Sequence, residues 1–246
     1  MKTHSAFSPS SFHIFLNCQR AYLLTKDIPS TDTVFTLEGT KAHEYVEYLV
    51  RKEILHEEVK EPDHDREMEI CGSDYLDFVK NKIMENIDSY IDTFVEEKIS
   101  FSKFIKDGFG SCDLLIVTKN KLIICDYKYG KGVEVDAKDN PQLMLYALGA
   151  LEFISINNIN DVLDIKEVEM NIFQPRIDNY STDTKSFDEL MAFGKKAHDI
   201  AALCLKKDAP IKAGSWCKRC KVNPICKERA KNCLKTIERI LSYGKN

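Results

Sequence analysis

Two aspartates and a lysine in the middle of the chain have the types and spacing of a metal-dependent hydrolytic centre. Asp113 lies upstream of Asp126, and Lys128 follows Asp126 by two residues. Residues two apart on a strand share a face, so Lys128 can act beside Asp126. Carboxylates hold hard ions such as Mg²⁺ or Mn²⁺, which promote phosphodiester hydrolysis by neutralising charge and activating water. The same spacing also fits a solvated strand end, so other residues must decide between these interpretations.

A histidine further upstream is a candidate fourth member of this centre. Residues 37–54 show helical periodicity, in which His43 shares a face with Val46 and Val50. His43 is therefore predicted to face inward. On its own, this position also suits a hydrogen-bonded core histidine.

Four cysteines at opposite ends of the chain form a second candidate metal site. Cys18 stands near the start, and Cys217, Cys220 and Cys226 follow the pattern C-x2-C-x5-C near the end. They could bind zinc or a 4Fe-4S cluster. Zinc sites usually present two close pairs of ligands, whereas here three ligands are local and one is remote, which favours iron–sulfur. We expect a structural role, in which the cluster ties the first helix to the last.

The remaining cysteines are interpreted as small buried hydrophobic residues. An odd total of nine cysteines fits a reducing compartment, where disulfides are rare. The five concerned are Cys71, Cys112, Cys125, Cys204 and Cys233.

The elements that must position these side chains alternate between helices and strands. Ser8-Pro9 predicts a helix start, and Asn140-Pro141 predicts another. Residues 112–117 and 121–126 are apolar runs that predict a β-hairpin; if Cys112 lies near Cys125 in it, Asp113 and Asp126 converge. Residues 166–173 alternate as a further strand. Because the hairpin is apolar on both faces, we expect helices on both sides of the sheet.

The fold class predicted from this order is α/β, with a central mixed sheet flanked by helices. We expect residues 1–246 to form a single domain. Residues from about 55 to 95, charged and then helical from Tyr75 to Ile91, are interpreted as an insertion. Residues 8–25 and 200–240 would form a helical cysteine-cluster region that joins the two ends.

Charge is distributed unevenly along the chain. The net charge is −4, but residues 195–246 carry 14 Lys and Arg against 4 Asp and Glu, whereas residues 1–194 carry 21 against 35. The basic end could hold phosphates beside the acidic centre, or it could be a solvated helical surface. No run approaches the length of a membrane span, and no signal peptide is evident, so we expect a cytoplasmic protein with no membrane partner. No phosphate-binding G-x-x-x-x-G-K-[ST] string occurs.

The motifs together resemble a known enzyme superfamily. The strings are Gly39-Thr40-Lys41-Ala42-His43, Gly110-x-x-Asp113, Asp126-x-Lys128 and Gln142-x-x-x-Tyr146. They resemble the RecB-like branch of the PD-(D/E)XK nucleases, and the cysteines resemble those of its iron–sulfur members, which include the CRISPR-associated adaptation exonucleases, the AddB nuclease subunit and phage relatives. The resemblance extends from Cys18 to Cys226 and is strongest to the phage group.

The resemblance implies a restriction-endonuclease-like core and a role for each matching residue. His43, Asp113, Asp126 and the main-chain carbonyl of Tyr127 would bind Mg²⁺ or Mn²⁺, and Lys128 would be the catalytic lysine. The pair Gln142 and Tyr146, one helical turn apart, would brace the lysine and contact DNA. Cys18, Cys217, Cys220 and Cys226 would bind the 4Fe-4S cluster. The family usually has glutamate in place of Asp126, and Glu97, in a possible leading strand, receives little weight.

The resulting hypothesis is a divalent-metal-dependent DNA exonuclease that acts on single-stranded ends, in phage or bacterial recombination. Recombination proteins would then be partners, and the sequence leaves the oligomeric state open. Two other hypotheses are a catalytically weak DNA-end-binding recombination partner and a zinc-stapled nucleic-acid-binding module.

Overall fold

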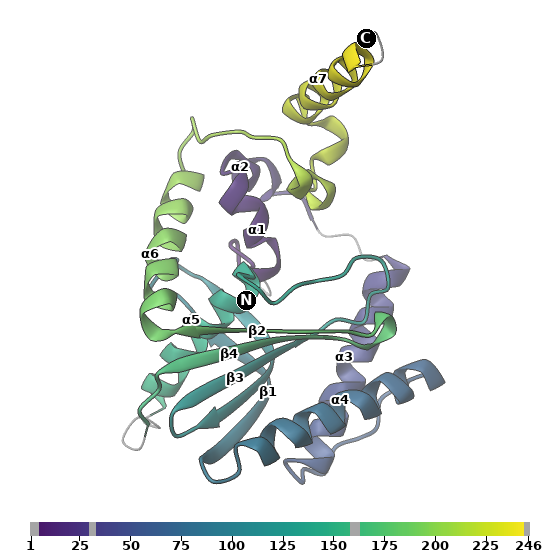
Figure 1. Ribbon diagram of the computed structural model, residues 1–246, viewed down its shortest axis with the longest axis vertical. Coiled ribbons are helices and arrows are strands. Elements are labelled where there is room, and N and C mark those ends of the chain that lie inside the picture. Colours follow the sequence, from purple (N-terminus) through teal and green to yellow (C-terminus); the bar gives the residue numbers. More distant parts are fainter. Residues whose placement is uncertain (1–4, 30–32, 158–162, 244–246) are drawn as a thin grey trace.

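The computed structural model describes residues 5–29, 33–157 and 163–243. Helices cover a single sheet, and the last helix extends away from the rest (Figure 1). The elements in chain order are α1 (Pro9–Asn17), α2 (Arg20–Thr25), α3 (Val34–Glu53), α4 (Arg66–Glu85), β1 (Tyr90–Ser100), β2 (Phe109–Thr118), β3 (Lys121–Tyr127), α5 (Pro141–Ile156), β4 (Glu167–Gln174), η2 (Pro175–Ile177), β5 (Asn179–Ser186), α6 (Phe187–Cys204), η3 (Ser215–Arg219), η4 (Asn223–Ile225) and α7 (Lys227–Tyr243).

The five strands form one mixed sheet in the order β1-β2-β3-β4-β5. β3 and β4 are parallel and are joined through α5, whereas the other neighbours are antiparallel. The predicted hairpin, the strand at residues 166–173 and the mixed α/β sheet are confirmed.

The register of the hairpin brings the two candidate aspartates to the same end of the sheet. Leu114 pairs with Cys125, and the next residues along the two antiparallel strands are Asp113 and Asp126. Cys112 therefore lies two residues from the position that pairs with Cys125, and the expected convergence of Asp113 and Asp126 occurs.

Both faces of the sheet are covered, as the apolar strands predicted. α1, α5 and α6 pack on one face, and α3 and α4 pack on the other (Figure 1). The central strands are almost completely removed from water, and each buried Leu or Ile side chain contributes roughly 1.5–3 kcal/mol of transfer free energy. The fully buried residues of β2 and β3 include Leu114, Leu115, Ile116, Val117, Leu122, Ile123 and Ile124.

The predicted helical insertion at about 55–95 is wrong in extent and in kind. Its helix ends at Glu85, and residues from Tyr90 onward form β1, which pairs with β2. α4 also contributes to the core, since Tyr75 and Val79 are buried against the sheet. Many of the charged residues of this segment lie in the loop before α4, and others lie on the outer face of that amphipathic helix.

Two further expectations need correction. Cys233 is exposed on α7, a helix that projects from the rest of the molecule (Figure 1), whereas the other four cysteines interpreted as buried are buried. Cys18 does not lie within the first helix but directly after α1, as its C-cap. Among the described helices, none has the length and apolar character needed to span a bilayer.

The start of α5 is determined by its cap. Asn140 Oδ1 accepts hydrogen bonds from the main-chain N–H groups of Gln142 (3.0 Å) and Leu143 (3.4 Å), and Pro141 occupies the first turn. The predicted start is confirmed, and it fixes the position of Gln142 in the first turn of the helix.

Candidate active site

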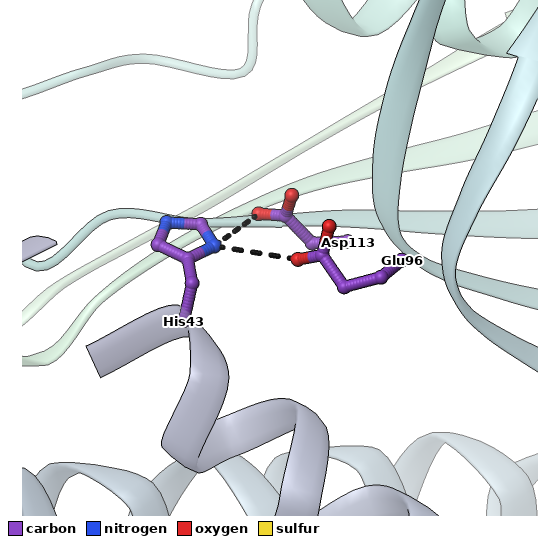
Figure 2. Close-up of side chains that lie close together, drawn as sticks. All are labelled: His43, Glu96 and Asp113. Atoms are coloured by element: carbon purple, nitrogen blue, oxygen red, sulfur yellow. Dashed lines mark ion pairs between the residues drawn. The ribbon is translucent and has the colours of Figure 1, made fainter. Parts of the chain in front are cut away.

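Three side chains from three different elements meet at one end of the sheet (Figure 2). His43 Nδ1 lies 3.5 Å from Asp113 Oδ2 and 3.6 Å from Glu96 Oε1. One ligand atom from each residue lies within 4.8 Å of the others, and no other such group of His, Cys, Asp or Glu occurs among the described residues. The hypothesis that His43 and Asp113 come together is therefore confirmed in its geometry.

Each of the three is placed by its own element. His43 comes from α3, whose opposite side exposes charged residues, and its ring meets the edge of the Tyr127 ring at 5.4 Å. Asp113 comes from β2 and accepts a hydrogen bond of 2.8 Å from the main-chain N–H of Tyr127. Glu96 comes from β1 and accepts a hydrogen bond of 2.8 Å from the Ser111 hydroxyl.

Glu96 is the site residue that the sequence did not indicate. Its φ is 51°, a left-handed conformation that costs a non-glycine residue of order 1–3 kcal/mol. The ladder pairs Val95 with Leu114 and Glu97 with Cys112, so Glu96 lies between two paired positions. The unusual backbone turns the Glu96 side chain toward His43. Neighbouring Glu97, considered in the sequence, is not part of the group of three.

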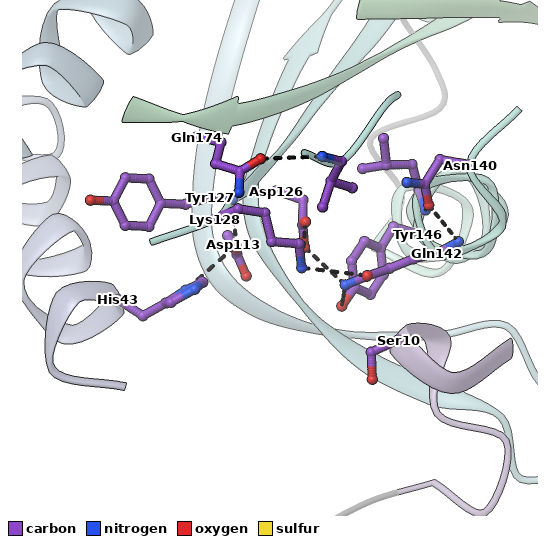
Figure 3. Close-up of polar contacts among 12 residues, drawn as sticks. Ser10, His43, Asp113, Asp126, Tyr127, Lys128, Asn140, Gln142, Tyr146 and Gln174 are labelled. Atoms are coloured by element: carbon purple, nitrogen blue, oxygen red, sulfur yellow. Dashed lines mark hydrogen bonds and ion pairs between the residues drawn. The ribbon is translucent and has the colours of Figure 1, made fainter. Parts of the chain in front are cut away.

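A second group of polar side chains adjoins the first (Figure 3). Lys128 Nζ lies 2.7 Å from Asp126 Oδ2. The Gln142 side-chain amide donates to Asp126 Oδ1 (2.9 Å) and lies 3.2 Å from the Tyr146 hydroxyl, and its oxygen accepts from Lys128 Nζ at 3.4 Å. Gln142 therefore connects the acid, the lysine and the tyrosine, and the predicted contact between Gln142 and Lys128 is present.

The electrostatics show that acidic groups are crowded together. Burial disfavours charge on the His43 ring, but the carboxylates of Asp113 and Glu96 outweigh this effect and raise the pKa of His43 to about 9. Burial also raises the pKa of Asp113 to about 7; His43 opposes this increase, while Asp126 and Glu96 add to it. A bound cation would relieve this repulsion, because it replaces protons as the neutralising charge.

The lysine keeps its proton in spite of its surroundings. Burial acts to lower the pKa of Lys128, but the charges of Asp126 and Asp113 outweigh burial and raise it. The half-buried ammonium of Lys128, next to two carboxylates, is a positive charge in a position to meet an anionic substrate.

Two predicted ligands are placed differently from the group of three. Asp126 belongs to the lysine group and is not a member of the group with ligand atoms within 4.8 Å. Tyr127 contributes its main-chain N–H to Asp113, and its buried ring lies with the helices of the α3–α4 face. Metal ligation by Asp126 and by the Tyr127 carbonyl stays a prediction.

The four candidate cluster cysteines gather around one small cavity. Cys18, Cys217, Cys220 and Cys226 all line it, with apolar neighbours that include Ile14. Main-chain N–H groups point at two of the sulfurs: Lys212 N lies 3.4 Å from Cys18 Sγ, and Gly214 N lies 3.4 Å from Cys217 Sγ. Hydrogen bonds of this kind stabilise thiolate ligands. The predicted meeting of the chain's two ends is therefore present in the fold.

Comparison with known proteins identifies a family and similar solved structures. A family model described as "Protein of unknown function (DUF2800)" matches residues 4–242. Among solved structures, "Crystal structure of SSO0001" aligns with a TM-score of 0.32 and 15% sequence identity, over 89% of this chain and 96% of its own chain.

Proposed function

The chain belongs to the DUF2800 family of proteins of unknown function, and we propose that it is a divalent-metal-dependent deoxyribonuclease. The observation that carries the proposal is the group His43, Glu96 and Asp113 beside the paired Asp126 and Lys128. An imidazole and several carboxylates next to a half-buried ammonium suit a phosphate-directed reaction.

The residues present fit a hard divalent cation. The group of three offers one nitrogen and two carboxylate oxygens that already lie within 4.8 Å of one another, and Asp126 is the next carboxylate along. Mg²⁺ and Mn²⁺ prefer oxygen ligands, and they usually bind only a few protein groups while keeping several coordinated waters. When bound, such an ion would neutralise the phosphate and lower the pKa of a coordinated water.

The side chains around the cation site would position the substrate. Lys128, kept protonated by Asp126 and Asp113, would lie beside a phosphate oxygen and stabilise the charge that develops there. Gln142 would hold the lysine in place through its contacts with Asp126 and Tyr146. Tyr146 is buried and would act through Gln142. The resemblance implies that it also contacts DNA.

The resemblance to RecB-like PD-(D/E)XK nucleases supports this proposal. In the mixed sheet, Asp113 of β2 lies beside Asp126 at the end of the adjacent strand β3, and Lys128 follows directly, which supports the proposal without deciding the core type. A DNA exonuclease on single-stranded ends, in phage or bacterial recombination in the cytoplasm, is the activity that we propose on the basis of that resemblance.

We further propose that the cysteine cavity holds a structural 4Fe-4S cluster. Around a single zinc ion, cysteine sulfurs at about 2.3 Å from the metal lie about 3.8 Å apart. No three of the cysteine sulfurs in the described part of the chain lie within 4.8 Å of one another, so the set is spread more widely than a zinc site. A cluster of several iron atoms suits sulfurs that surround a common cavity at larger separations.

The test is cleavage of end-labelled single- and double-stranded DNA by anaerobically purified protein, with Mn²⁺ and with chelator. We expect Mn²⁺-dependent cleavage that Asp113→Asn abolishes and Lys128→Ala reduces by about 10²–10³-fold. Lys103→Ala, at an exposed lysine between β1 and β2, is the control. Binding without cleavage, or cleavage that Lys128→Ala leaves intact, would contradict the proposal and favour a DNA-end-binding role.

A further inference from the structure

Two hollows adjoin the candidate active site and differ completely in the charge of their lining residues. One lies over His43 and is lined by Glu44, Glu47, Glu96 and Asp113, with no lysine or arginine among its lining residues. The other includes Lys128 itself and carries no carboxylate at all. An anion would therefore be repelled on the first side in the absence of a cation and attracted on the second.

The second hollow is formed where α1 meets the cysteine segment. Ser10 and His13 of α1 line one side, Arg219 of η3 lines another, and Lys128 and Gln142 form the end toward the active site. Figure 3 shows Ser10 on its helix close to Gln142, on the side away from His43. No hydrogen bond or ion pair to a protein group is found for the Arg219 side chain in the described part of the chain, although its charge acts on both His13 and Lys128.

A third hollow continues the second. It shares Ser10 and Arg219 with it, and leads along α1 to Lys26 at the end of α2. It is lined by several serine hydroxyls and again by no carboxylate. Within the described residues, the Lys26 ammonium has a single ion pair, at 3.9 Å, with the exposed Asp27. The two hollows together form a path, free of acidic groups, from Lys128 past Arg219 to Lys26.

We propose that this path holds the sugar-phosphate backbone of the DNA strand on one side of the scissile bond, with Arg219 and Lys26 as phosphate contacts. Guanidinium and ammonium groups with hydroxyl donors are the usual phosphate-binding set, and they carry no base information. The strand therefore passes between α1 and the cysteine segment, and base sequence has little influence on binding. The cysteine cavity shares Ile14 of α1 and Cys220 with the third hollow, so a cluster there would fix the wall that presents Arg219.

This inference rests on the proposed nuclease function, but its test does not require cleavage. Binding of a fluorescein-labelled oligothymidylate is measured in Ca²⁺ across a range of salt concentrations, with the integrity of the strand checked afterwards. Arg219→Gln and Lys26→Gln are compared with Arg66→Gln, an exposed arginine at the start of α4 on the far face of the sheet. Iron content and thermal melting are recorded, because Arg219 lies between two of the cluster cysteines.

Each of the two path variants is expected to weaken binding by about tenfold and to reduce the salt slope by about 0.7, the contribution of one phosphate contact on a single strand. Arg66→Gln should bind like the unmodified protein. Lys26 is outside the cysteine motif, so a loss there cannot come from damage to the cluster. Unchanged affinity and slope in both variants, or no binding by the unmodified protein, overturns the path. If both path variants weaken DNA binding as expected but the unmodified protein never cleaves DNA, the nuclease proposal is refuted and the DNA-binding path is retained.

Discussion

Replacing Glu96 by glutamine is the sharpest test of the metal centre, because the change keeps the shape of the side chain and removes its charge. Glu96 Oε1 lies 3.6 Å from His43 Nδ1, and the side chain is 26% exposed. Two unit charges about 4 Å apart near a protein surface interact by about 4 kcal/mol at an effective dielectric constant of 20. Partial exposure and the amide oxygen that remains reduce this effect.

We therefore expect Glu96→Gln to lose roughly 2–3 kcal/mol of Mn²⁺ binding free energy, a weakening of about 30- to 150-fold. Isothermal titration with Mn²⁺ measures the change directly. Glu97→Gln is the matched control: it is the same chemical change one residue along, at a position that pairs with Cys112 and lies outside the group of three.

The reasoning about Glu96 is refuted if Glu96→Gln binds Mn²⁺ as tightly as the unmodified protein. It is also refuted if Glu97→Gln loses as much affinity as Glu96→Gln, since the backbone at Glu96 would then not have the orienting effect inferred from its positive φ.

Three further predictions follow from the same geometry. The free energy of unfolding, measured by chemical denaturation, should be about 1 kcal/mol higher for Glu96→Gly than for Glu96→Ala. This reverses the usual order in a strand, because φ at this position is 51°. Mn²⁺ affinity should rise from pH 6 to about 9, because His43 (pKa about 9) and Asp113 (pKa about 7) must lose protons to bind metal; titration calorimetry in two buffers measures the protons released. Anaerobically purified Cys18→Ser should lose its iron by metal analysis, whereas Cys233→Ser, at an exposed position, should keep it.

Each of these three predictions has a result that would contradict it. If Glu96→Ala is more stable than Glu96→Gly, the left-handed backbone at this position relaxes at no cost. A Mn²⁺ affinity that is flat with pH would show that the two groups are already deprotonated in the free protein. Equal iron in the Cys18 and Cys233 variants would remove Cys18 from the cluster.

Much of the site could be predicted from the sequence because its members follow strong local signals. Asp113 stands at the start of one apolar run and Asp126 at the end of the next, both runs are recognisable as strands, and Lys128 follows at a spacing that fixes its face. His43 lies on a periodic helix, and Gln142 follows a proline and a capping asparagine. For these residues, local chain geometry determines the direction of the side chain.

Glu96 and the role of α4 were missed for a different reason. Strand alternation cannot decide between Glu96 and Glu97, because the choice depends on one left-handed residue in β1. α4 has apolar residues at helical spacing, but its many charged residues hid the buried face that holds Tyr75. β5 was not foreseen because it is an edge strand of polar residues, with Tyr180 as its one aromatic. Each of these depends on tertiary packing rather than on local pattern.

The cap at Asn140 makes the active site sensitive to helical phase but tolerant of loop length. Gln142 reaches both Asp126 and Lys128 only because α5 begins where it does. One residue inserted between Pro141 and Gln142 would rotate that amide by roughly 100° about the helix axis and away from both partners. One residue inserted at Gly132, which is exposed with open space around it, would be absorbed before the helix starts. An insertion before α5 should therefore disturb the candidate site much less than an insertion within the first turn of the helix.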